Sequence, residues 1–130
     1  MSDRTVLHTS HVTVRWGDMD ALGHVNNATY FTYAEQVRIE WLRACVPERR
    51  DSGPLIASIR ADYRAPVHFP ATVEVEVLAG DAGRSSLTQG YRLSVDGTVV
   101  CEVEAVLVWV SRETGRPVSL PDAVRAANDA

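Results

Sequence analysis

The chain has 130 residues, 45% of them hydrophobic, and a formal net charge of −4. This length and composition predict a single domain over residues 1–130, and the acidic balance argues against a nucleic-acid partner, which normally requires a basic stripe. No apolar run approaches the ~20 residues that span a bilayer and the first residues lack the apolar stretch of a signal peptide, so we expect a cytoplasmic protein with no membrane partner.

The N-terminal third predicts a strand, an irregular loop and a long helix. Apolar and polar residues alternate over 5–16, which is typical of a half-buried strand. Two glycines, two aspartates and two asparagines within 17–27 indicate an irregular loop. An apolar stripe at helical spacing follows, with Arg38 on the polar side and with Asn26 or Asn27 as the N-cap. The stripe consists of Tyr30, Tyr33, Ala34, Val37, Trp41 and Ala44.

The remainder of the chain is rich in predicted strands. Alternating patterns occupy residues 55–64, 73–77, 87–95 and 101–109. Apolar residues on both faces are typical of a central, covered strand, so we expect the last of them to lie inside the sheet and not at an edge. The remaining predictions are a connection at Gly80–Gly83, a tight hairpin turn at Asp96-Gly97, a short helix over Pro121–Ala127, and core positions for Trp16, Trp41 and Trp109.

The order of these elements predicts an α+β fold. One strand, one long helix and four further strands lack the βαβα alternation of a parallel sheet. A single antiparallel sheet packed on one helix explains the pattern. Because such a two-layer domain leaves one sheet face and the edge strands uncovered, we expect the chain to form oligomers.

Unusual residues are concentrated in 15–30, where a strand ends and the long helix begins. A helix N-terminus offers unpaired N–H groups and a positive dipole end, which can hold a developing oxyanion. A nearby carboxylate can act as nucleophile or general base, so the segment contains the parts needed for acyl transfer. The residues alone leave a second interpretation open: a capped loop in which Asp18 and Asp20 bind their own main chain.

A family resemblance favours the first interpretation. The motifs that carry it are Arg15-Trp16, Asp18-x-Asp20, Gly23-His24-Val25-Asn26-Asn27, Tyr30 and Asp62-Tyr63-Arg64-x-Pro66. They resemble the 4-hydroxybenzoyl-CoA thioesterase group of hotdog-fold acyl-CoA thioesterases, and the likeness extends over nearly the whole chain. It implies a five-stranded antiparallel sheet wrapped around one long helix. The loop is more similar to the broader acyl-CoA branch than to the hydroxybenzoyl enzyme, so that substrate is not implied.

The resemblance also implies roles for single residues. Asp20 corresponds to the catalytic carboxylate, acting as nucleophile or as general base, while Asp18 would serve the turn. The backbone N–H of Asn27 corresponds to the donor that polarises the thioester oxygen. His24 would either orient the carbonyl or water, or bind the loop main chain. Tyr30 corresponds to an aromatic substrate-site position that also lines the core. Neither a metal nor an organic cofactor is implied.

Four arginines are candidates for contacts with the phosphates of coenzyme A: Arg60, Arg64, Arg84 and Arg92. A guanidinium gives bidentate contacts to phosphate, although scattered arginines on strands are usually solvated or paired with acids. We expect Arg64 and Arg84 to be the phosphate ligands, because both stand near strand ends.

Other reactive side chains have simpler interpretations. A spacing of three on a strand puts His8 and His11 on opposite faces, which excludes a metal pair there. His68 follows a proline turn and is expected to be exposed and polar. Cys45 and Cys101 have neither a metal nor a redox spacing, so we expect two buried, reduced thiols.

The reaction implied by the resemblance is hydrolysis of an acyl-CoA to a free acid and coenzyme A. A homodimer joined edge to edge, or a homotetramer, would place the active sites at the subunit interface. Two alternatives stay open: a thioesterase acting on acyl-carrier proteins, and a non-catalytic acyl-CoA-binding member of the fold. A serine hydrolase is excluded by the lack of a Gly-x-Ser-x-Gly elbow.

Overall fold

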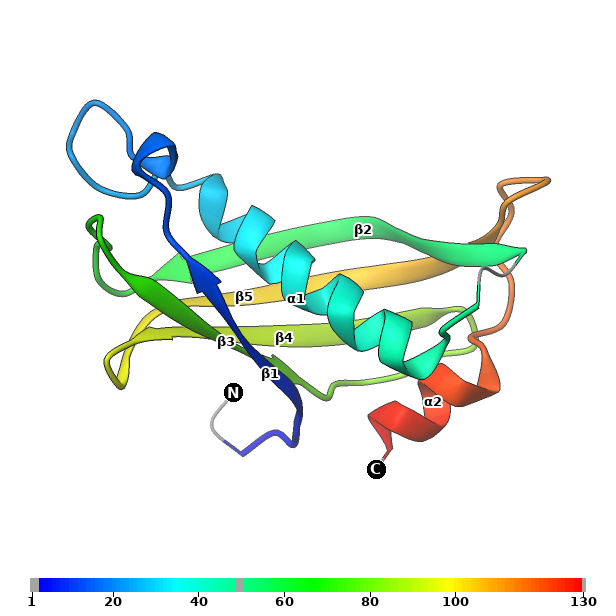
Figure 1. Ribbon diagram of the computed structural model, residues 1–130. Coiled ribbons are helices and arrows are strands. Elements are labelled where there is room, and N and C mark those ends of the chain that lie inside the picture. The colour runs from blue at the N-terminus through cyan, green and yellow to red at the C-terminus, as the bar shows by residue number, and fades with distance from the viewer. Residues whose placement is uncertain (1–2, 49–50, 130) are drawn as a thin grey trace.

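The computed structural model describes residues 3–48 and 51–129. Five strands form one antiparallel sheet in the order β1-β3-β4-β5-β2. The sheet curves around α1, which crosses it diagonally, with α2 at the C-terminal end of α1 (Figure 1). The elements are β1 (Val6–Thr13), η1 (Trp16–Asp18), α1 (Thr29–Cys45), β2 (Ser52–Tyr63), β3 (Thr72–Leu78), β4 (Ser86–Val95), β5 (Thr98–Ser111) and α2 (Asp122–Asn128). The predicted α+β hotdog architecture is confirmed.

The helix α1 buries the predicted stripe except at its end, where Ala44 is exposed. The assignment of Arg38 to the polar side is wrong. Arg38 is only 6% exposed, and its guanidinium lies 5.7 Å from the ring centre of Tyr91 on β4. The curved sheet covers this flank of the helix, so a cation there packs against an aromatic ring instead of water.

Alternate residues of the central strands form the other half of the core. The inward-facing positions of β3, β4 and β5 are almost fully buried, as the period-2 pattern predicts. They are the apolar residues Val73, Val75, Val77, Leu87, Tyr91, Leu93, Cys101, Val103, Ala105, Leu107 and Trp109, together with the polar Gln89. β5 pairs on both sides, with β4 and with β2, which confirms that it is an interior strand, although β4 occupies the middle of the order.

Two predictions about side-chain direction are wrong. Trp16 is 77% exposed, because β1 ends at Thr13 and the chain turns into η1 before the tryptophan can reach the core. The uniform alternation expected in β2 is interrupted by a register shift between Ile56 and Ser58. As a result Leu55 is 60% exposed on the face of β2 opposite to that of Ile59.

The turns and helix ends follow the sequence closely, with one exception. Asp96 and Gly97 both have positive φ, 51° and 82°, as the predicted hairpin turn requires. The N-cap of α1 is Ala28 and has no side-chain cap. Asn26 instead accepts a 2.9 Å hydrogen bond from the Ala28 N–H through its side chain, so it supports the turn before the helix and is not the N-cap.

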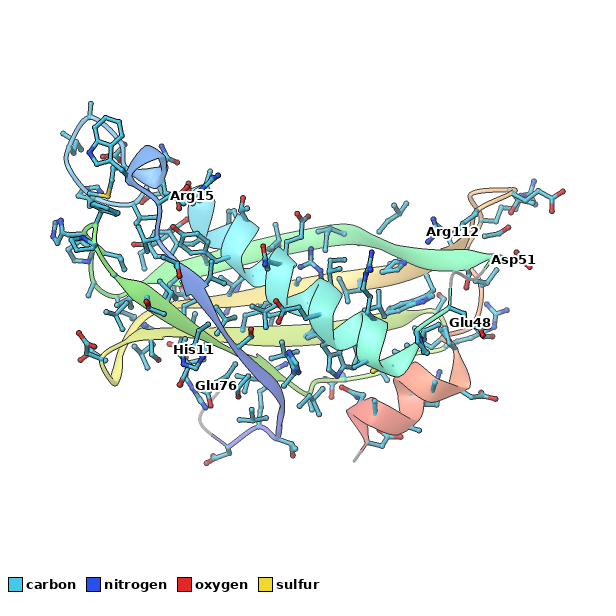
Figure 2. The ribbon with its side chains drawn as sticks, in the orientation of Figure 1. His11, Arg15, Glu48, Asp51, Glu76 and Arg112 are labelled. Atoms are coloured by element: carbon cyan, nitrogen blue, oxygen red, sulfur yellow. The ribbon has the colours of Figure 1, made fainter. Side chains whose placement is uncertain are left out.

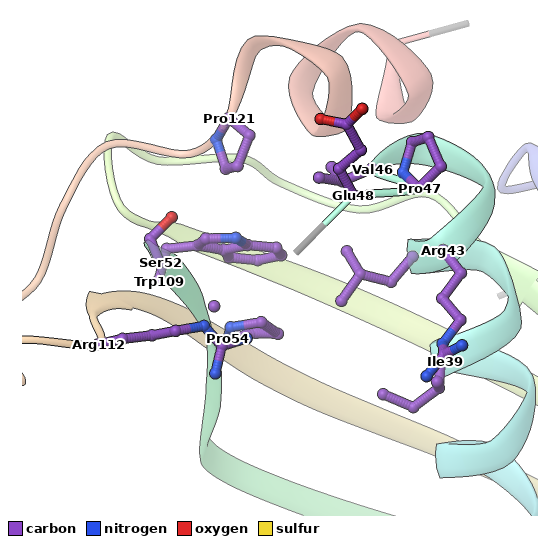
Figure 3. Close-up of a pocket in the computed structure, with 12 residues that line it drawn as sticks. Ile39, Arg43, Val46, Pro47, Glu48, Ser52, Pro54, Trp109, Arg112 and Pro121 are labelled. Carbon is purple, nitrogen blue, oxygen red and sulfur yellow. The ribbon is translucent and has the colours of Figure 1, made fainter. Parts of the chain in front are cut away.

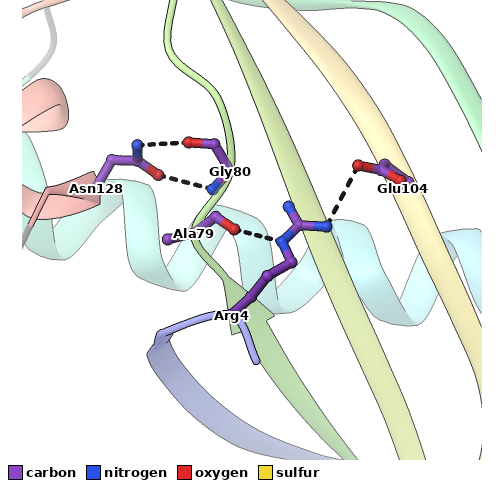
Figure 4. A network of polar contacts seen from close by, with 5 residues as sticks. All are labelled: Arg4, Ala79, Gly80, Glu104 and Asn128. Carbon is purple, nitrogen blue, oxygen red and sulfur yellow. Dashed lines mark hydrogen bonds and ion pairs between the residues drawn. The ribbon is translucent and has the colours of Figure 1, made fainter. Parts of the chain in front are cut away.

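A polar network ties the two ends of the described chain to the connection between β3 and β4 (Figure 4). The Arg4 guanidinium donates to the Ala79 carbonyl and to Glu104 Oε1, the latter at 3.3 Å. Asn128 binds both the N–H and the carbonyl of Gly80. Arg4 can lie flat on the sheet because Gly90 has no side chain: a Cβ there would come within 2.9 Å of Arg4 Nη1.

Candidate active site

The loop between η1 and α1 is a folded segment with its own main-chain bonds, at the upper left of Figure 1. Met19 and Val25 form an isolated bridge, and the Asp20 N–H donates to the His24 carbonyl at 2.9 Å. Gly23 has φ of 86° where the chain reverses, and its N–H donates to the Asp20 carbonyl at 3.1 Å. Through these bonds the main chain holds Asp20 and His24 side by side.

Asp18 anchors the loop from below. Asp18 is only 5% exposed. Its carboxylate accepts hydrogen bonds from the main-chain N–H and the guanidinium of Arg15, and a 2.7 Å hydrogen bond from the Tyr33 hydroxyl. Burial opposes ionisation, but these donors outweigh it and hold the pKa of the Asp18 carboxyl below its ordinary value. Figure 2 shows Arg15 where β1 gives way to the loop. The contacts with Arg15 support the turn, as the sequence predicts, and the bond from Tyr33 additionally ties the turn to α1.

Asp20 presents its carboxylate differently. Its side chain is 24% exposed, so a substrate can reach it. Oδ1 accepts a 2.9 Å hydrogen bond from the Leu22 N–H, and Oδ2 lies 3.6 Å from His24 Nδ1. One oxygen is therefore fixed by the main chain, while the other faces an imidazole and is available for chemistry.

A second histidine supports the loop, which the sequence did not indicate. His68 Nδ1 lies 2.9 Å from the Gly23 carbonyl, and since a carbonyl only accepts, Nδ1 carries the proton. The rings of His24 and His68 meet edge to face with centres 6.3 Å apart. His68 is exposed, as expected, but its hydrogen bond to the Gly23 carbonyl also supports the loop that carries Asp20.

The main chain around Asn27 offers the donor that the resemblance implies. Asn27 is exposed just before α1, and its N–H donates to no acceptor among residues 3–48 and 51–129. Its carbonyl accepts a 2.7 Å hydrogen bond from the hydroxyl of Tyr63, the last residue of β2. An unpaired N–H beside a helix N-terminus can stabilise an oxyanion.

Tyr30 lies beneath this donor, in the core. It is 2% exposed, and its ring meets that of Tyr63 edge to face at 5.2 Å and that of Tyr33 at 6.4 Å. Burial raises the pKa of the Tyr30 hydroxyl. Within one chain Tyr30 forms the floor of the loop, and its predicted contact with substrate stays a prediction.

The two arginines expected to bind phosphate lie at opposite ends of the sheet. Arg64 follows Tyr63 directly and binds Glu102 Oε1 through Nε at 3.1 Å and Nη2 at 2.9 Å. Arg84 lies in the connection before β4, where its carbonyl accepts a bond from the Leu120 N–H near α2. Of the two, only Arg64 is near the Asp20 loop of its own chain.

A cavity of about 540 Å³ lies at the other end of α1, between the helix and the start of β2 (Figure 3). It combines an apolar wall with two guanidinium groups. Its lining includes Ile39, Leu42, Arg43, Pro54, Trp109 and Arg112. Its size suits a small ligand, but it lies far along the helix from Asp20 in the same chain.

The two histidines of β1 have acidic partners, and the two cysteines are free thiols. His8 lies 3.4 Å from Glu40 of α1, whereas His11, labelled on β1 in Figure 2, lies 3.4 Å from Glu74, which confirms that the two face opposite ways. Cys101 is buried and Cys45 half-buried, both without a disulfide. Burial raises the pKa of the Cys101 thiol to about 12, so it is no nucleophile at neutral pH.

Comparison with known proteins identifies the family. The model of the thioesterase-like superfamily matches residues 14–127. The chain belongs to this superfamily. The YsmA protein of Bacillus subtilis strain 168 is 33% identical over 114 residues, which cover 85% of this chain and 78% of that protein.

Two solved structures extend the likeness. The PA2801 protein of Pseudomonas aeruginosa is 41% identical, with a TM-score of 0.89 over 95% of this chain and 98% of that one. A thioesterase from Thermus thermophilus, solved with coenzyme A and zinc, is 32% identical, with a TM-score of 0.79 over 94% and 91% of the two chains. The protein is therefore a thioester hydrolase with the hotdog fold.

Within the described residues, neither helix has the length and hydropathy of a membrane span.

Proposed function

We propose that this protein hydrolyses acyl-CoA thioesters with Asp20 as its catalytic carboxylate. One observation carries the proposal: a single loop holds a reachable carboxylate and, at the start of α1, the N–H of Asn27, which has no acceptor in the described part of the chain. A thioester carbonyl placed between them would meet a base or nucleophile on one side and an oxyanion donor on the other. The structure of the Thermus relative with coenzyme A supports the choice of thioester.

Two routes fit this geometry. In the first, an Asp20 oxygen attacks the carbonyl carbon, the C–S bond breaks, coenzyme A leaves as a thiolate that takes up a proton, and water hydrolyses the acyl-aspartyl anhydride. In the second, Asp20 accepts a proton from water, and the resulting hydroxide attacks the carbonyl carbon and displaces the thiolate. Both give a free acid and coenzyme A, and in both the Asn27 N–H stabilises the oxygen anion.

We further propose a homodimer joined through β2. Within the described residues this edge strand pairs with β5 alone, and it exposes Leu55 by 60%, Ile56 by 41% and Tyr63 by 43%. Two copies of an edge strand pair antiparallel about a two-fold axis, so the Ser52 end of one β2 meets the Tyr63 end of the other. The cavity at Pro54 and Trp109 would then lie beside the partner's Asp20 loop.

This arrangement gives the cavity and Arg84 a role. The cavity of one subunit, with its two guanidinium groups, would receive part of the coenzyme A portion of a substrate bound at the partner's loop. Arg84, which lies near the cavity, would be at hand for the phosphates of the same molecule. Arg64 would bind the phosphates from the same subunit that supplies Asp20. In this arrangement each site is completed by both subunits.

The test is release of free thiol from acyl-CoAs ranging from acetyl to long chains, with benzoyl and phenylacetyl included, by the wild type and Asp20→Asn. General-base catalysis is worth on the order of 10²–10⁴-fold, so we expect at least that loss in the variant. Asp96→Asn, the same change in a distant hairpin turn, is the matched control. Near-normal turnover by Asp20→Asn would defeat the assignment. Activity restricted to acyl-carrier-protein thioesters, or binding without turnover, would favour the two alternatives.

A further inference from the structure

Tyr63 joins the edge strand to the proposed oxyanion donor. Its hydroxyl donates to the Asn27 carbonyl at 2.7 Å, across 36 residues of chain. Its ring rests edge to face on Tyr30, with centres 5.2 Å apart and planes at 77°. Tyr30 is only 2% exposed, so the Tyr63 ring packs against a core residue while its hydroxyl binds the loop.

Both peptide groups that flank the Asn27 Cα are held. The first, which contains the Asn27 N–H, is held through the Asn26 carbonyl, which accepts from the Thr29 N–H at 2.9 Å. The second, which contains the Asn27 carbonyl, is held by the Tyr63 hydroxyl. Among the described residues, Tyr63 is the single side chain from another element that binds the main chain of residues 26–28. The Ala28 N–H of this second peptide group also donates to Asn26 Oδ1 at 2.9 Å, so Tyr63 adds to this local bond a tie from the sheet.

We propose that Tyr63 is a positioning residue that fixes the Asn27 main chain so that its N–H points at the thioester oxygen. This inference rests on the function proposed above. An oxyanion donor acts by being in place before charge develops, and a misplacement of about 1 Å can cost on the order of 10²-fold in rate. Tyr63 makes no bond to Asp20, so its contribution is separate from that of the carboxylate.

The inference predicts a defect in the chemical step alone. Tyr63→Phe keeps the ring and its contact with Tyr30 but removes the hydroxyl. We expect kcat to fall about tenfold with KM unchanged, since the donor matters most in the transition state. Replacing Tyr63 with 4-aminophenylalanine, which restores a donor at the same ring position, should recover most of the lost kcat. Tyr91→Phe, which removes a buried hydroxyl far from the loop, is the matched control and should keep kcat.

A second readout does not depend on turnover. In the ¹⁵N-labelled protein, the order parameter of the Asn27 amide should fall in Tyr63→Phe and recover with 4-aminophenylalanine. Wild-type kcat and an unchanged Asn27 order parameter in Tyr63→Phe would overturn the inference. So would a raised KM at constant kcat, which would make Tyr63 a substrate contact, or a lost kcat that 4-aminophenylalanine does not restore. Failure of Asp20→Asn to lose activity would count against the proposed function, whereas the order parameter tests Tyr63 by itself.

Discussion

The hydroxyl of Tyr33 on α1 lies 2.7 Å from Oδ2 of Asp18 and ties the floor of the Asp20 loop to the buried face of the helix. Tyr33 is 4% exposed and Asp18 5%, so this bond is shielded from water. A hydrogen bond to a charged group contributes about 1.5–3 kcal/mol, more than a neutral pair. The contact therefore gives the loop a rigid base.

Removing this donor should destabilise the protein. We expect Tyr33→Phe to lower the free energy of unfolding by about 1.5–3 kcal/mol, because the Asp18 carboxylate loses one partner while the ring stays in place. Urea denaturation at neutral pH measures the change. Thr32→Val, a substitution on the same helix at a residue outside this contact, provides the comparison. Equal stability of Tyr33→Phe and wild type would show that the bond adds nothing.

The same carboxylate predicts a pH dependence of stability. The pKa of Asp18 is lowered in the folded protein, so its stabilising effect is complete above the unfolded value of about 4 and disappears as the pH falls through the lower folded value. We expect Asp18→Asn to be less stable than wild type at pH 7 and the gap to narrow below about pH 4. Urea denaturation between pH 7 and pH 3 measures it. A gap that stays constant over this range would contradict the assignment.

His24 should act on turnover and not on folding. Its side chain faces Asp20 Oδ2 at 3.6 Å, whereas its contribution to the loop comes from its main-chain carbonyl. We expect His24→Ala to reduce kcat about tenfold through loss of orientation, with an unchanged melting temperature. His24→Asn, which keeps a nitrogen near the position of Nδ1, should retain more activity. A loss of stability without a loss of kcat would assign His24 to the loop alone.

The β2 edge should control assembly. A lysine on an edge strand opposes pairing with another strand, so we expect Ile56→Lys to shift the protein from dimer to monomer. Thr9→Lys, on the exposed edge strand β1 at the other side of the sheet, should leave the dimer intact. Analytical ultracentrifugation distinguishes the two. If Ile56→Lys sediments like the wild type, β2 is not the interface. Because each proposed site spans two subunits, the monomer should also lose activity.

The local parts of this protein could be predicted from its amino-acid sequence. Alternation identified the inward faces of β3, β4 and β5, the 3.6-residue stripe identified the buried face of α1, and Asp96-Gly97 identified a hairpin turn. These features follow from the chain's own periodicity and backbone preferences. The loop motif also placed Asp18 in the turn, since its main partner is only three residues away.

Contacts between distant segments became clear only in the folded chain. The residue pattern of β2 does not predict the register shift that turns Leu55 outward, because a bulge depends on how the strand pairs with its partner β5. Arg38 is buried because the curved sheet covers its flank, and Trp16 is exposed because β1 ends early. The bond between Tyr63 and Asn27 likewise joins residues that only the wrapping of the sheet around α1 brings together. Sequence periodicity describes one element at a time, whereas these contacts depend on how two elements meet.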